Sequence, residues 1–166
     1  MKNFIIVLFL FISSHLYSKN ENFAYIIKVD GGINPASQNY IENALNKALK
    51  HNAKFLLIEL NTPGGLLNST RKIVQEIIKS EVPSVVYITP SGAQAGSAGV
   101  MITMAANIAA MAPATNIGAA HPVSSTGKDI DKNMSEKIEN DTIAFVKSIA
   151  EHRKRHVRLI QGCFLR

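Results

Sequence analysis

A serine flanked by glycine and alanine has the surroundings that best suit covalent chemistry in this chain. Ser97 lies in a run of small residues, 92–99, which follows a β-branched stretch, 82–88, and precedes an apolar run, 100–106. This order predicts a buried strand, a tight turn and a helix that begins beside Ser97. Unpaired N–H groups and the helix dipole at that point could stabilise an oxyanion beside a nucleophile. The alternative is a Gly/Ala-rich turn in which Ser97 only caps the helix.

A Gly-Gly loop is predicted to lie next to this turn. Gly64 and Gly65 end the run at residues 61–65, which directly follows a strand-like stretch at residues 54–60. Loops at the carboxyl ends of neighbouring parallel strands meet at one edge of the sheet, where open α/β proteins bind ligands. One N–H from Gly64 or Gly65 and one from Ala98 could then bind the same oxygen. A plain turn is the alternative, and neither loop matches a phosphate-binding fingerprint.

A nucleophilic serine needs a group that accepts its proton, and histidine is the first type to consider. His51 is predicted at a helix end, and His121 lies in an irregular stretch without an orienting carboxylate nearby. His152 and His156 are four residues apart in a basic region, but no third ligand accompanies them, so a solvated helix end is favoured over a metal site. The imidazoles therefore give no clear base.

Lysine is the other type of base, because Ser–Lys dyads occur. A lysine acts as a base only when its pKa is lowered, and burial or the positive end of a helix does this. Asn133 and Glu136 resemble a capping box, which predicts that Lys137 lies in the first turn of a helix. A solvated surface position is the alternative for any single lysine.

Strands and helices alternate along the chain and must position these residues. Strand-like stretches are predicted at residues 23–29, 54–60, 82–89 and 107–111, and helices at 35–51, 68–80, after Ser97, and from about 134 to 149. Asn34 and Pro35 give a cap followed by proline at the first helical position. Residues 112–132 show no period and are predicted to be irregular. This β–α alternation predicts an α/β fold with a mainly parallel sheet.

Composition limits the class of protein. The 166 residues are 46% hydrophobic and 18% charged, which is typical of one globular domain. The net charge of +6 comes largely from the C-terminal end, where Arg153, Lys154, Arg155, Arg158 and Arg166 lie. There is no basic surface with interleaved aromatic residues, so nucleic-acid binding is not expected. Cys163 is the only cysteine, which excludes an intramolecular disulfide and a cysteine-cluster metal site.

The N-terminal segment is predicted to be a signal peptide. Lys2 supplies a basic start, residues 4–12 form a short apolar region, and Ser18 provides a small residue for cleavage. We expect export through the inner membrane to a periplasmic or other extracytoplasmic location. A retained N-terminal anchor is the alternative.

The chain also resembles the NfeD-type, membrane-bound, ClpP-class serine proteases, which are partners of stomatin-like proteins within the ClpP/crotonase superfamily. The resemblance covers about residues 23–155 and rests on six segments in order: Gly31-Gly32-Ile33, Glu59-Leu60-Asn61-Thr62-Pro63-Gly64-Gly65, Gly92-Ala93-Gln94-Ala95-Gly96-Ser97-Ala98-Gly99, Met111-Ala112-Pro113, Ile117-Gly118-Ala119-Ala120 and Lys137-Ile138-Glu139-Asn140.

This resemblance implies a ClpP/crotonase-like fold of βαβ units around a mainly parallel sheet. It implies that Ser97 is the nucleophile, Lys137 the general base, and the Gly64-Gly65 loop with Ala98 the oxyanion hole. It further implies a serine endopeptidase that cleaves hydrophobic segments of a stomatin- or prohibitin-like membrane protein. A homo-oligomer is implied, and no cofactor, nucleotide or metal.

The predicted organisation is a signal peptide at residues 1–18, a protease domain at 19–155 and an atypical basic tail at 156–166. The tail does not resemble the helix and strand that continue the family's protease domain, and the family's membrane spans and β-barrel domain are not matched. We therefore expect the domain to be incomplete. Two other functions are considered: a non-catalytic scaffold for membrane assembly, and a crotonase-type acyl-CoA enzyme that shares the two-amide oxyanion hole.

Overall fold

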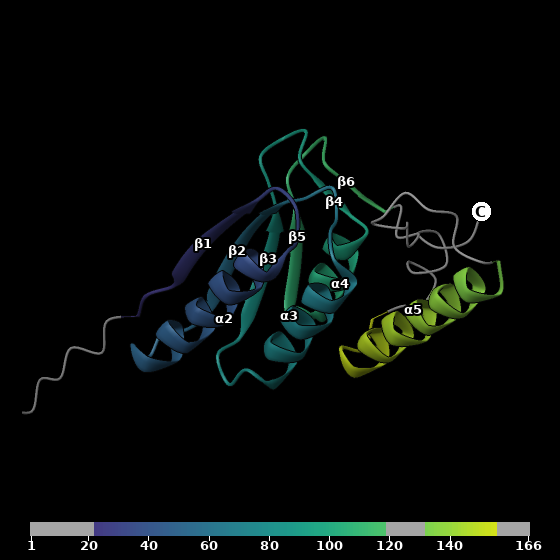
Figure 1. Ribbon diagram of the computed structural model, residues 1–166. Helices are drawn as coiled ribbons and strands as arrows, with labels where there is room; N and C mark the ends of the chain where they lie inside the picture. Colours follow the sequence, from purple (N-terminus) through teal and green to yellow (C-terminus); the bar gives the residue numbers. More distant parts are fainter. Residues whose placement is uncertain (1–21, 119–131, 156–166) are drawn as a thin grey trace, which may run out of the picture.

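A four-stranded parallel sheet forms the centre of the protein, as the α/β pattern of the sequence predicts. The computed structural model describes residues 22–118 and 132–155. The strands are β1 (Tyr25–Asp30), β2 (Leu56–Asn61), β3 (Ser84–Ile88) and β5 (Ile108–Met111), in the order β1-β2-β3-β5, and all pairs are parallel. The helices are α2 (Pro35–Lys50), α3 (Leu67–Lys79), α4 (Ala98–Ala105) and α5 (Lys132–His152) (Figure 1).

The start of α2 follows from its sequence. The Asn34 side chain accepts hydrogen bonds from the N–H groups of Ala36 (2.8 Å) and Ser37 (3.1 Å). The Ser37 hydroxyl in turn accepts one from the Asn34 N–H (2.9 Å), and Pro35 occupies the first helical position. The predicted cap is therefore confirmed, and it fixes the crossover between β1 and β2.

The helices cover one face of the sheet. Alternate strand residues on that face are fully buried, as in β2 and β3, and the strands β1–β3 and helices α2–α4 share one hydrophobic core. The opposite face is only partly buried, and Ile26 and Ile108 are each 59% exposed there. The register aligns these two with Leu57 and Val85 across all four strands. The predicted buried strand at residues 82–88 is thus buried on one face of the sheet and only partly buried on the other.

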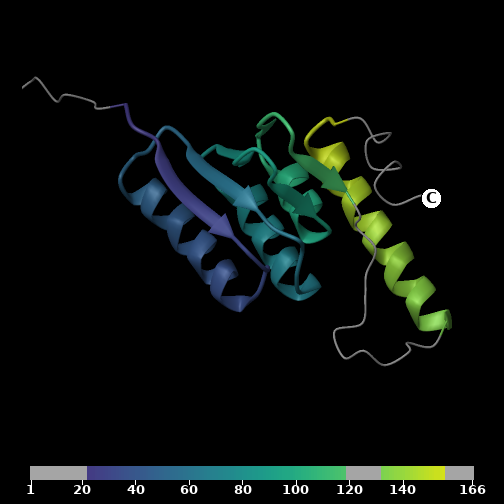
Figure 2. The same ribbon diagram turned by 90° about the horizontal axis from the view of Figure 1, so that it is seen from above.

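Helix α5 is attached at its C-terminal end. Arg153 donates to the carbonyl oxygens of Ala105 (2.6 Å) and Ile77 (3.3 Å), and Arg155 donates to that of Ala106 (2.8 Å). Burial lowers the pKa of both arginines, and the charge of Arg153 lowers that of Arg155 further. In Figures 1 and 2 the green, N-terminal end of α5 lies at the outer edge of the molecule.

In the described ranges, no helix is long and apolar enough to cross a membrane.

A second, two-stranded parallel sheet was not predicted. β4 (Gln94–Gly96) pairs with β6 (Asn116–Gly118), inside stretches that the sequence indicated to be a turn and an irregular loop. Each strand has only three residues, too few to show an alternating pattern. The small sheet lies at the site described next, because β4 ends immediately before Ser97.

Candidate active site

Ser97 has a backbone conformation that is rare for a residue with a side chain. Its φ of 44° and ψ of −103° lie outside the commonly populated regions, at the junction of β4 and α4. Its side chain makes no capping hydrogen bond to the helix, so the interpretation of Ser97 as an ordinary N-cap is wrong. A serine on a sharp, strained strand-to-helix turn is the arrangement that presents a nucleophile in several hydrolase folds.

The Gly64-Gly65 loop packs directly against this turn, as the sequence predicts. A Cβ atom on Gly64, whose φ is +127°, would lie 2.9 Å from the Ser97 Cβ, and one on Gly96 would lie 2.6 Å from the Pro63 carbonyl oxygen. Two backbone bonds join Thr62 to β4: Thr62 N–H to the Gln94 carbonyl (2.8 Å) and Gly96 N–H to the Thr62 carbonyl (2.9 Å). Only glycine allows these backbones to approach so closely.

The amide groups around Ser97 differ in their availability. The Gly64 N–H donates to the Thr62 hydroxyl (3.1 Å), and the Ser97 N–H donates to the Gly118 carbonyl (3.1 Å). By contrast, the N–H groups of Gly65 and Ala98 donate to no other described residue. Gly65 forms a parallel bridge with Ile33, a geometry that directs its own N–H away from Ile33. Two free donors therefore lie on the two segments that meet at Ser97.

Thr62 is a site residue that reasoning from the sequence missed. Its side chain is fully buried, and its hydroxyl both receives the Gly64 N–H and lies 3.1 Å from the Gly64 carbonyl oxygen. Its methyl group fills the space beside Gly99, where an added Cβ would lie 2.8 Å away. Thr62 thus fixes the Gly-Gly loop against the start of α4. A threonine next to a Pro-Gly-Gly loop was the available signal.

Lys137 lies on α5 and is exposed. The helix begins at Lys132, before the predicted cap at Asn133, so Lys137 is in the second turn and not in the first as predicted. The helix dipole acts mainly within the first turn, so the position expected from the sequence is not the one that Lys137 has. Among the hydrogen bonds of the described residues, none joins Lys137 to the Ser97 hydroxyl.

The two candidate histidines that the structure describes, His51 and His152, lie away from Ser97. His51 and His152 are exposed at the C-terminal ends of α2 and α5. His121 and His156 lie outside the described residues, as do the predicted signal peptide and basic tail. Within the described ranges, no group of three or more His, Cys, Asp or Glu residues could hold a metal ion.

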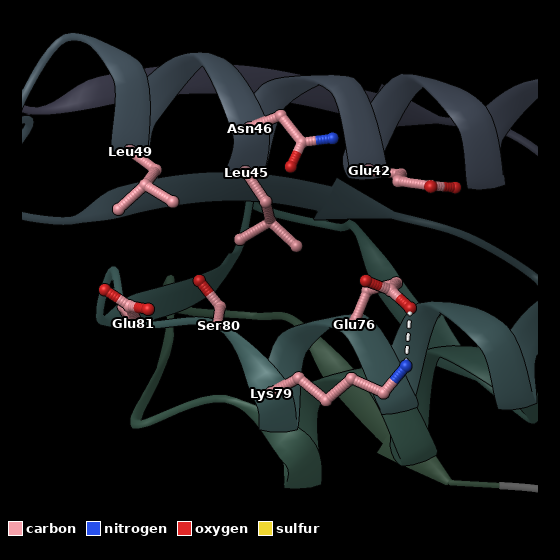
Figure 3. Close-up of a pocket in the computed structure, with 8 residues that line it drawn as sticks. All are labelled: Glu42, Leu45, Asn46, Leu49, Glu76, Lys79, Ser80 and Glu81. Atoms are coloured by element: carbon pink, nitrogen blue, oxygen red, sulfur yellow. Dashed lines mark hydrogen bonds and ion pairs between the residues drawn. The ribbon is translucent and has the colours of Figure 1, made fainter.

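A cavity of about 160 Å³ lies away from this site, between the C-terminal halves of α2 and α3. In Figure 3, Glu42 and Asn46 of α2 face Glu76 and Lys79 of α3, and a 3.1 Å ion pair joins the last two. None of the predicted site residues lines this cavity. The cavity therefore lies outside the candidate site at Ser97.

Comparison with known proteins identifies the family. The NfeD1b N-terminal domain family matches residues 23–162, and the chain belongs to this family. It is 34% identical over 158 residues to the membrane-bound protease PH1510 of Pyrococcus horikoshii. This alignment covers 93% of this chain and 35% of that protein. It is 31% identical over 108 residues to membrane protein NfeD1b of Bacillus subtilis, covering 65% of this chain and 24% of that one. The chain therefore spans about a third or less of these relatives.

Solved structures with the same fold include mutants of a related protease. A serine-to-alanine mutant of the 1510-N membrane-bound stomatin-specific protease matches with a TM-score of 0.80 and 33% identity, over 87% of this chain and 70% of that one. A lysine-to-alanine mutant in complex with a substrate peptide matches with a TM-score of 0.81 and 33% identity, over 88% and 67%.

A more distant structure defines the fold alone. ClpP1 of Listeria monocytogenes matches with a TM-score of 0.64 at 20% identity, over 86% of this chain and 79% of that one. The predicted ClpP-like fold is therefore confirmed.

Proposed function

We propose that this protein is a serine endopeptidase in which Ser97 is the nucleophile and Lys137 the general base. The observation that carries the proposal is the conformation of Ser97, φ 44° and ψ −103°, with its hydroxyl uncommitted to capping α4. Such strain persists only where the surrounding structure imposes it, and it is concentrated at functional sites. The mutated serine and lysine of the solved stomatin-specific protease are the same residue types.

The proposed oxyanion hole consists of the N–H groups of Gly65 and Ala98. Their freedom from other described partners supports this choice, and the bond between the Gly64 N–H and Thr62 favours Gly65 over Gly64 as the donor. Gly64 then acts by bringing the loop against Ser97. Preorganised amides of this kind stabilise the charge that develops in acyl transfer.

The reaction follows from these roles. The neutral amine of Lys137 accepts the proton of the Ser97 hydroxyl as Oγ bonds to the carbonyl carbon of the substrate peptide. The resulting oxyanion accepts hydrogen bonds from Gly65 and Ala98. The Lys137 ammonium then protonates the leaving amine as the peptide bond breaks, which leaves an ester on Ser97. Water then hydrolyses the ester: Lys137 accepts a proton from the water as its oxygen bonds to the carbonyl carbon, and returns that proton to Ser97 Oγ as the ester bond breaks.

For this chemistry Lys137 must come within hydrogen-bond distance of Ser97. Lys137 is exposed and lies four residues before Asp141, which pairs with Arg71 of α3. Catalytic hydrogen bonds are often long in a free enzyme and shorten when substrate binds. We propose that the N-terminal turns of α5 approach the Ser97 turn in the complex with substrate.

We propose hydrophobic polypeptide segments as substrates, with a stomatin-like membrane protein as the natural one. The support is the name of the solved relative, which is specific for a stomatin homologue.

The organisation proposed for the chain is a signal peptide at residues 1–18, a protease domain at 19–155 and a basic tail at 156–166. Export of the chain would follow from the signal peptide. Homologues named as membrane-bound support a location at the membrane. N-terminal sequencing of protein secreted from cells tests cleavage near Ser18.

Labelling with a fluorophosphonate probe, read by intact-mass spectrometry, tests the mechanism. The wild-type protein should gain one probe adduct, and Ser97→Ala and Lys137→Ala should gain none while keeping the far-ultraviolet circular dichroism of the wild type. Labelling that persists in Ser97→Ala overturns the assignment of the nucleophile. A folded wild-type protein that does not react supports the non-catalytic scaffold instead.

A further inference from the structure

Arg71 of α3 makes two contacts to one side of α5. Its guanidinium forms an ion pair with the Asp141 carboxylate, and it lies over the Phe145 ring at 4.3 Å from the ring centre. The Arg71 side chain is 28% exposed, whereas that of Asp141 is 66% exposed. A fixed arginine therefore holds a carboxylate that would otherwise be free in solvent.

The spacing of the residues on α5 places this ion pair next to Lys137. Lys137, Asp141 and Phe145 are successive members of a row four residues apart, and such residues are neighbours on a helix surface. The Asp141 carboxylate is thus within reach of both the Lys137 ammonium and the Arg71 guanidinium. A carboxylate beside an ammonium favours its protonated form. A lysine held in this way is a poorer base, because more of it carries its proton.

Other charges near Lys137 do not replace this pair. Glu136 precedes Lys137 directly in the sequence, so it does not share the row of residues four apart. Helix α4, which packs against α5, has no charged residue, and Arg71 is the cation that α3 places on this side of α5 among the described contacts. The competition for Asp141 is therefore between Lys137 and Arg71.

We propose that Arg71 is a positioning residue that engages Asp141 and so prevents this carboxylate from stabilising the protonated form of Lys137. This role rests on the proposed Ser97–Lys137 dyad. Arg71 touches neither the serine nor the substrate, and it acts through Asp141. When Arg71 is absent, Asp141 is released and pairs with Lys137 on the adjacent turn.

The test is the pH dependence of the fluorophosphonate labelling rate in the full chain. Arg71→Gln should move the midpoint of the rate profile about 0.3 pH units higher, because the released carboxylate stabilises the ammonium and solvent screens this exposed pair. At a pH below both midpoints, this lowers the rate about twofold. Adding Asp141→Asn should return the midpoint to the wild-type value, because an amide carries no charge to hold the lysine.

A purely structural role for Arg71 predicts different results. In that case Arg71→Gln reduces the rate at every pH without a change of midpoint, and Asp141→Asn does not restore it. Either result overturns the inference. Lys79→Gln is the matched control, because it breaks the Lys79–Glu76 ion pair on the same helix (Figure 3) and should leave the profile unchanged.

The same series separates this inference from the proposed function. If Ser97→Ala or Lys137→Ala reacts with the probe like the wild type, the dyad itself is wrong. If both residues are required and the Arg71→Gln midpoint does not move, the dyad stands and only the role of Arg71 is rejected. Thermal unfolding of each variant establishes that the rates compare folded proteins.

Discussion

The two halves of the proposed site are held in different ways. Ser97 and its neighbouring amides are fixed by backbone contacts among three separate segments, as the bonds from Gly96 to Thr62 and from Ser97 to Gly118 illustrate. Lys137 is exposed on α5, and Asp141, one turn further along this helix, pairs with Arg71 of α3. The proposed nucleophile and oxyanion donors are thus held by backbone bonds, whereas the proposed base lies on a helix that Arg71 contacts through side chains. Substitutions should therefore affect stability strongly in the first region and weakly in the second.

The largest effect is expected for Gly65→Ala. The added Cβ would lie 2.1 Å from the Ile33 carbonyl oxygen, so two backbone segments must separate. We expect a loss of more than about 3 kcal/mol in the free energy of unfolding, at the upper end of overpacking effects. Urea denaturation measures it. Gly32→Ala is the matched control, because its Cβ would meet only the Gly64 carbonyl at 3.9 Å. Equal stability of the two variants would show that the loop contact is not rigid.

The next effect concerns the attachment of α5. Arg153→Ala removes the hydrogen bonds to the carbonyls of Ala105 and Ile77 at the ends of two helices. Hydrogen bonds from charged groups contribute about 1.5–3 kcal/mol, so a loss of about 2 kcal/mol is expected. Lys154→Ala, at the exposed neighbouring position, should change stability by less than about 0.5 kcal/mol. If Arg153→Ala leaves the free energy of unfolding unchanged, packing alone holds the helix.

A smaller effect, a gain in the free energy of unfolding, is expected at Ser97. Ser97→Gly relieves the positive φ of 44°, which costs about 1–3 kcal/mol for a residue with a Cβ. Part of this gain is lost because glycine is more flexible in the unfolded chain. We expect Ser97→Gly to be about 1 kcal/mol more stable than Ser97→Ala in urea denaturation, with neither variant labelled by the probe. Equal stability would argue against strain at this residue.

The smallest effect on stability is expected for Lys137→Ala. The side chain is exposed, so the free energy of unfolding should change by less than about 0.5 kcal/mol, although labelling of Ser97 should be lost. Lys147→Ala, an exposed lysine on the same helix, should keep both stability and labelling. A large destabilisation in Lys137→Ala would contradict the contrast between the two regions.

Much of this arrangement could be predicted because it depends on patterns within single segments. The alternation of apolar runs and caps gave the order of strands and helices, and the Asn34 cap was correct in detail. The meeting of the Gly64-Gly65 loop with the Ser97 turn followed from the rule that loops at the carboxyl ends of parallel strands share one edge.

The remaining features depend on contacts between distant segments. The pairing of β4 with β6 joins two three-residue strands of mostly small residues, which carry no periodic signal. The choice of Gly65 over Gly64 as the free donor depends on the buried Thr62 hydroxyl. The relation of Lys137 to Asp141 and Arg71 requires α5 to be placed against α3, and no pattern within the helix gives that placement.

The environment of α4 has a consequence for the lifetime of the site. All eight residues of this helix, Ala98–Ala105, are buried. Amide hydrogens in such an element exchange with solvent only when the whole domain opens, whereas exposed helix ends exchange through local fraying. The serine at the start of α4 therefore keeps its geometry for as long as the domain remains folded. Lys137, by contrast, is exposed near the start of α5, so we expect the amides around it to exchange through local fraying.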